Sequence, residues 1–210
     1  DPVSFAIIVD YWLYLHHDVE LKSKYMDANQ AESLLKQYIS DQKMLYHCYA
    51  SEAVMRALAR RLGRDEEKWA TAGLLHDIDA EITEKDPQRH ALEAIPILRE
   101  QGLPEDALDA IKMHNEEATG RERETEFQHA LAAGETITGL IYATALVYPD
   151  KKIQSVKPKS IKKRMKEKAF AASVNRDAIR ECEQIGIPLD EFIELSLNAM
   201  KEIDDKLGLD

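Results

Sequence analysis

The chain has 210 residues, of which 44% are hydrophobic and 32% are charged, and its formal net charge is −11 at pH 7. This size and composition fit one large domain with a hydrophobic core. The acidic balance argues against general affinity for nucleic acids or membranes, and no segment reaches the about 18 apolar residues of a membrane span. Only Cys48 and Cys182 are present, far apart, which favours a reducing compartment. We therefore expect a cytoplasmic protein.

The first part of the chain is expected to be an extension. The apolar stretch 5–9 is interrupted by Asp10, and it lacks the basic flank and small-residue cleavage site of a signal peptide. Met26 precedes a well-formed helix start at Asp27. We expect residues 1–26 to form an N-terminal extension and residues 27–210 to form the domain.

Helical signals recur along the predicted domain, and alternating apolar and polar runs typical of strands are absent from the sequence. Asp27 and Asp65 are placed to cap helix N termini, and Gly63 to end a helix in the left-handed conformation. Pro87 and Pro104 are typical first residues of helices. The predicted helices cover about 27–40, 47–62, 65–77, 87–102, 104–114, 124–148, 175–186 and 188–207. We expect an all-α bundle of about eight or nine helices.

One segment differs sharply from the acidic remainder. Residues 151–168 hold nine lysines and arginines against a single acid, Glu167. Such a run is often a solvated helix face, but it can also supply phosphate contacts. The candidates for substrate binding are Lys159, Lys162 and Lys163.

The pair His76-Asp77 is the most informative feature of the chain. It ends the apolar run 70–75, and two adjacent polar side chains cannot both enter a helix core cheaply. Burying either side chain without a partner would cost several kcal/mol. A divalent metal removes this difficulty, because a neutral imidazole and a carboxylate are both good ligands.

Other candidate ligands lie near the ends of predicted helices. A metal site needs side chains from several helices, so that packing fixes their geometry. His47, His90 and His114 meet this requirement, and Glu135 of the long predicted helix would add a carboxylate. Each residue taken alone is more often a cap, a solvated side chain or an ordinary helix residue. The remaining histidines are not expected to be ligands: His16, His17 and His129.

The order of these residues resembles the HD-domain superfamily of metal-dependent phosphohydrolases, which is named for its His-Asp doublet. His47 precedes the doublet by 29 residues, and an acidic residue follows in a later helix. The resemblance extends over roughly 28–207, and its local text is similar to one uncharacterised bacterial branch. The similar segments are 45–48, 72–79, 89–90, 113–115, 138–141, 157–163 and 170–171.

The resemblance implies metal ligands at His47, His76, Asp77 and a late aspartate. This chain has Glu135 where the branch usually has aspartate, which adds one methylene and keeps the charge. His90 and His114 match positions that supply a second metal in binuclear members. The resemblance therefore implies one or two divalent ions.

The implied chemistry is hydrolysis of a nucleotide or other small phosphorylated metabolite by a metal-activated water. Two imidazoles and two carboxylates suit Mn²⁺, Fe²⁺ or Ni²⁺, with Zn²⁺ also suitable. Asp79, just beyond the doublet, is the candidate general acid or base, and its alternative role is to cap the next turn.

Two other functions stay open at this stage. The first is oxidative: a minority of proteins with this architecture use a di-iron pair and O₂, which requires His90 and His114 as ligands. The second is a non-catalytic ligand-binding module, to which the glutamate at position 135 gives some weight. We expect a small phosphorylated substrate as partner and neither a membrane nor nucleic acid, and a homo-oligomer stays open.

Overall fold

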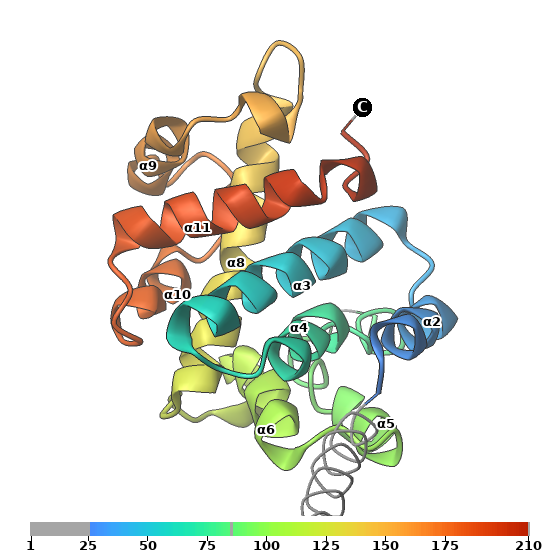
Figure 1. The fold of residues 1–210 in the computed structure, drawn as a ribbon. Coiled ribbons are helices and arrows are strands. Elements are labelled where there is room, and N and C mark those ends of the chain that lie inside the picture. The colour runs from blue at the N-terminus through green and yellow to red at the C-terminus, as the bar shows by residue number, and fades with distance from the viewer. Residues whose placement is uncertain (1–25, 85, 210) are drawn as a thin grey trace, which may run out of the picture.

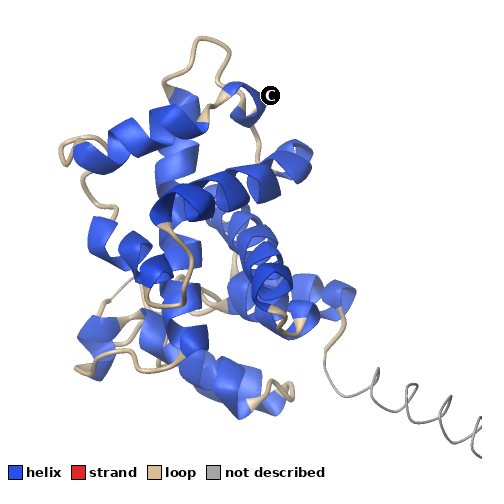
Figure 2. Cartoon of the chain, turned by 60° about the vertical axis from the view of Figure 1, so that its left-hand side comes forward, coloured by secondary structure: helices blue, strands red, loops and turns tan. Residues whose placement is uncertain are grey.

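The computed structural model describes residues 26–84 and 86–209, and these residues form ten α-helices and three 3₁₀ helices without any strand (Figure 2). The all-α prediction is confirmed, with ten α-helices in the described residues where about eight or nine were expected. Apart from Met26, the expected extension 1–26 lies outside the described residues. The α-helices are α2 (Ala28–Tyr38), α3 (Gln42–Leu62), α4 (Glu66–Leu75), α5 (Ala94–Glu100), α6 (Glu105–His114), α7 (Glu116–Thr119), α8 (Glu126–Leu146), α9 (Pro158–Lys166), α10 (Arg176–Arg180) and α11 (Leu189–Glu202). The 3₁₀ helices are η1 (Ile153–Ser155), η2 (Glu181–Glu183) and η3 (Asp204–Lys206).

The predicted helix signals act as expected at several ends. The side chains of Asp27, Asp65 and Asn175 each accept a hydrogen bond from a backbone N–H of the first turn of α2, α4 and α10. Gly63 ends α3 with φ at 66°, a left-handed conformation that costs glycine little. Local sequence therefore sets these boundaries.

Two predicted helix starts are wrong, and α10 and α11 end at Arg180 and Glu202 rather than near residues 186 and 207. Helix α3 begins five residues earlier than expected, capped by Asp41, so His47 lies inside the helix rather than at its start. The helix expected from Pro87 begins only at Ala94, because turns occupy residues 87–93 and Ala91 has a φ of 71° that no helix accommodates.

The two longest helices, α3 and α8, form the centre of the bundle (Figure 1). Helix α3 packs against α4 on one side and α11 on another, and α8 also contacts α6. The contact between α3 and α4 is very close at Gly73, where an added Cβ would lie 2.6 Å from the carbonyl oxygen of Ser51. This close contact brings the second half of α4 against the third turn of α3.

Membrane insertion was not expected. Among the described residues, every helix is too short or too polar to pass through a lipid bilayer.

Candidate metal centre

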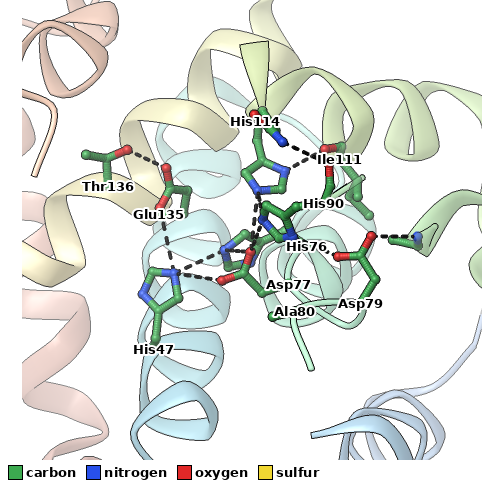
Figure 3. Close-up of polar contacts among 12 residues, drawn as sticks. His47, His76, Asp77, Asp79, Ala80, His90, Ile111, His114, Glu135 and Thr136 are labelled. Atoms are coloured by element: carbon green, nitrogen blue, oxygen red, sulfur yellow. Dashed lines mark hydrogen bonds and ion pairs between the residues drawn. The ribbon is translucent and has the colours of Figure 1, made fainter. Parts of the chain in front are cut away.

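Side chains from distant parts of the chain converge beside the end of α4 (Figure 3). His47 comes from α3, His114 is the last residue of α6, and His90 lies in the turns before α5. His76 and Asp77 directly follow α4. These residues are far apart in the sequence, and the packing of α3, α4 and α6 brings them into a single cluster.

One group of ligand atoms consists of His47, His76 and Asp77, whose atoms all lie within 4.8 Å of one another. Nε2 of His47 is 3.1 Å from Nε2 of His76 and 3.5 Å from Oδ2 of Asp77. Nε2 of His76 is 3.4 Å from Oδ1 of Asp77. Two imidazole nitrogens and a carboxylate at these separations suit one divalent ion.

A second group shares the same carboxylate. Nε2 of His90 lies 3.0 Å from Oδ1 of Asp77, and Nε2 of His114 lies 3.4 Å from the same oxygen. The two imidazole nitrogens are themselves 3.1 Å apart. Asp77 is therefore placed between two sets of imidazoles, as a residue that bridges two ions must be.

Each of the four imidazoles is held through its other nitrogen, Nδ1. His76 and His114 have Nδ1 at 2.8 Å and 2.6 Å from the carbonyl oxygens of Gly73 and Ile111. A carbonyl only accepts, so both nitrogens must donate. The corresponding contacts of the other two are from His47 to Thr138 Oγ1 (2.9 Å) and from His90 to Asp79 Oδ1 (2.8 Å).

Thr138 must also accept from its histidine, because its hydroxyl hydrogen is donated to the backbone oxygen of Glu135 at 2.6 Å. In the neutral form, every Nε2 in the cluster thus carries a lone pair. Two such nitrogens face each other at 3.1 Å in each group, an arrangement that repels unless a cation lies between them. Fixed Nδ1 donors and converging Nε2 lone pairs are what a metal centre requires.

The pKa values of two imidazoles in the cluster shift in opposite directions. Burial lowers the pKa of His76 to about 3, so this side chain stays neutral and ready to ligate. Burial also opposes protonation of His90, but its hydrogen bonds to Asp77 and Asp79 outweigh burial and raise its pKa to about 10. In the protein alone, a proton on His90 partly balances the Asp77 carboxylate, and a divalent ion must displace this proton.

The comparisons agree with this geometry. Residues 44–146 match the family model of the HD domain. The chain contains an HD domain. No match was found among the curated proteins or among the solved structures. The matched part of the chain includes His47, His76, Asp77, His90, His114 and Glu135. HD domains belong to a superfamily of metal-dependent hydrolases, and the histidine–aspartate cluster of this one can hold a metal.

Glu135 lies at the edge of the HD-domain cluster. Its Oε2 is 3.7 Å from Nε2 of His47, while its other carboxylate oxygen accepts from the hydroxyl of Thr136. Burial raises the pKa of Glu135, although the nearby imidazoles of His47 and His114 oppose this effect. Glu135 belongs to neither of the compact groups, so its place as a ligand stays a prediction.

Asp79, the predicted general acid or base, lies inside the protein beside His90. It is fully buried, and its Oδ2 accepts from the backbone N–H of Ala94 at 2.9 Å. Its Oδ1 holds Nδ1 of His90. Because both oxygens are engaged away from solvent, we assign Asp79 a role in positioning His90 and starting α5, and its role as a general acid or base stays a prediction.

We expect Asp79→Asn to weaken metal binding by about 10-fold to 100-fold. Asparagine has one side-chain oxygen, so it cannot use two oxygens to accept from His90 and from Ala94 as Asp79 does. Titration with Mn²⁺ against a competing chelator measures this loss. Asp106→Asn is the matched control, since Asp106 of α6 is a surface partner of Lys68 of α4. The metal affinity of this variant should equal that of the unmodified protein. Equal affinity in the Asp79→Asn variant would contradict the positioning role.

The sequence offered no signal for Arg123, whose side chain is only 3% exposed. Its guanidinium donates to the carbonyl oxygens of Met113, at 2.9 Å, and His114, at 3.5 Å. Glu181 of η2 holds the same guanidinium at 2.8 Å and 2.9 Å, and also contacts Nδ1 of His129 at 2.7 Å. Arg123 thereby fixes the last turn of α6, which carries a candidate ligand.

The lysines of the basic segment do not join this centre. Lys162 pairs with Asp190 of α11 at 2.6 Å, and Lys163 lies 3.5 Å from Glu167. Lys159 and Lys162 line a shallow pocket between α9 and α11. None of the three predicted substrate lysines lines a pocket that borders the histidines, and the lysine that does so is Lys43.

Proposed function

We propose that this protein is a metal-dependent phosphohydrolase that acts on a nucleotide or another small phosphorylated metabolite. The observation that carries the proposal is the convergence of four imidazole Nε2 atoms on Asp77, each imidazole being held in place through Nδ1. A pocket borders this cluster, so a small substrate has access to it. Its lining residues are Met44, Asp77, Ala80, Pro87, His90, Asn115 and Glu117.

Different sets of residues in the cluster would hold the two ions. His47, His76 and Asp77 would hold one ion, and Asp77, His90 and His114 a second. A bound divalent ion lowers the pKa of water and withdraws charge from phosphorus. Asn115 donates to the backbone oxygens of Pro87 at 2.7 Å and His90 at 2.9 Å, and so keeps the His90 segment against the end of α6.

A second candidate function rests on the same shared carboxylate. Two groups of ligands joined by Asp77 also meet the requirement of a di-iron pair that reacts with O₂. This alternative predicts bound iron and oxygen consumption with an organic substrate. The hydrolytic proposal predicts phosphate release without oxygen.

The deciding experiment is elemental analysis of the purified protein, followed by a screen for phosphate release with added Mn²⁺, Ni²⁺ or Fe²⁺. We expect bound metal and phosphate release that a chelator abolishes and fresh metal restores. Oxygen consumption without phosphate release would favour the oxidative alternative. Tight metal and ligand binding without any turnover would favour a non-catalytic module.

A further inference from the structure

A second pocket lies on the other side of His47, between α3 and α8, and Met200 of α11 contributes to its wall. Its volume is about 230 Å³. A water molecule occupies about 30 Å³ in the liquid, so the pocket has room for roughly eight waters. An organic group with one ring system has a similar volume. The pocket is large enough for a substantial part of a small ligand and too small for a macromolecule.

The pocket shares His47 with the candidate metal centre. The imidazole of His47 lines it, and the same imidazole contributes Nε2 to the first group of ligand atoms. Thr138, which holds Nδ1 of His47, also lines the pocket. A ligand in this space therefore contacts a side chain that belongs to the reaction site.

The wall of the pocket is mostly apolar and partly open to solvent. Besides the rings of Tyr46 and Tyr142, it consists largely of small or aliphatic groups such as Ala143 and Leu146. Leu146 is 46% exposed, although it is a large hydrophobic residue. An open apolar concavity beside a polar centre is typical of a ligand site.

One wall is fixed by the C-terminal part of the chain. Gly208 has a φ of 61°, and a Cβ there would overlap the ring of Tyr46. The ring thus lies directly against backbone, which leaves it little freedom to turn. This wall of the pocket is therefore set in place before any ligand arrives.

The charge at the pocket points to an anionic ligand. Among the described residues that line it, Lys43 is the one with a permanent charge, and no acidic side chain contributes. Lys43 is exposed and precedes His47 by one turn of α3, so both side chains lie on the same helix face. An ammonium group here suits an oxygen of a phosphate.

We propose that this pocket binds the non-reacting, apolar, ring-sized part of the substrate, and that Lys43 contacts its phosphate. The substrate class is then a phosphate ester of an aromatic or similarly flat apolar group. A sugar with several hydroxyls would find few hydrogen-bond partners on this wall. The inference rests on the proposed function only for the reaction at the phosphate.

The test compares the binding of phenylphosphonate and methylphosphonate to the Mn²⁺-loaded protein by calorimetry. We expect phenylphosphonate to bind about tenfold more tightly, because only its ring buries apolar surface in the pocket. Ala143→Trp fills the pocket and should abolish this preference. Ala57→Trp places the same side chain in a separate pocket between α3 and α11, and should keep it.

Two further variants keep the inference testable if Ala143→Trp does not fold. Leu146→Asn alters an exposed residue, and should reduce the preference for phenylphosphonate without disturbing the helices. Lys43→Gln should weaken both phosphonates by a similar factor and leave the preference intact. Equal affinities in the unmodified protein, or an unchanged preference in both Ala143→Trp and Leu146→Asn, would overturn the inference.

The outcomes also separate this inference from the proposed function. A clear preference for phenylphosphonate in a protein that releases no phosphate would reject hydrolysis and leave the pocket assignment standing. Rapid phosphate release from many esters, with no preference for aromatic ones in binding, would reject the pocket assignment and leave hydrolysis standing.

Discussion

Asp77→Ala is expected to lose metal and turnover together, with activity at least about a thousandfold lower and the helical circular dichroism unchanged. The reason is its position: Oδ1 lies 3.0 Å to 3.4 Å from three imidazole nitrogens, and Oδ2 lies 3.5 Å from a fourth. Removing it leaves the four imidazoles without the anion that attracts a cation. The apolar core does not include the Asp77 side chain and keeps the helices in place.

Metal content by elemental analysis and the rate of phosphate release are the two measurements for this variant. Asp190→Ala is a matched control, because Asp190 of α11 is an exposed partner of Lys162 of α9. It should keep both metal and activity. Full activity in the Asp77→Ala variant would remove the basis of the hydrolytic proposal.

Gly73→Ala is expected to lower the free energy of unfolding by about 2 kcal/mol or more, although alanine favours helices by up to about 1 kcal/mol. Its Cβ would lie 2.6 Å from the backbone oxygen of Ser51, and backbone cannot turn aside as a side chain can. The two helices must separate. The carbonyl of Gly73 also holds Nδ1 of His76, so metal affinity should fall with stability.

Urea unfolding of the metal-free protein, combined with metal titration, measures both effects. Gly134→Ala is the informative comparison, because its Cβ would meet the flexible end of Met55, with Sδ at 2.9 Å. We expect a loss of less than about 1 kcal/mol there. Similar losses at the two glycines would show that the contact between α3 and α4 is more tolerant than the geometry indicates.

Local chemistry explains what could be predicted from the sequence. Asp27, Asp65 and Gly63 act on backbone within a few residues, so they are readable without a structure. The doublet His76-Asp77 was informative for a similar reason, because two polar groups at the end of an apolar run require an explanation. The fold class followed from many such local signals that agree.

The remainder depends on contacts across the chain. Helix α5 starts at Ala94, whose N–H donates to the distant carboxylate of Asp79, a contact that no local pattern reveals. Arg123 and Glu181 are 58 residues apart, so no local pattern joins them. The role of the basic segment in substrate binding stays a prediction, and charge alone does not reveal that Lys162 pairs with Asp190 of α11.

The contact between Arg123 and Glu181 has a consequence for the limits of the functional unit. The matched HD-domain segment ends at residue 146, whereas Glu181, the closer of two carboxylates that pair with the buried guanidinium of Arg123, lies well beyond that point. A shortened protein ending there would keep every histidine of the cluster and also Glu116, which lies 3.2 Å from the guanidinium, but it would lose both hydrogen bonds from Arg123 to Glu181. The C-terminal third therefore supports the last turn of α6, which carries His114.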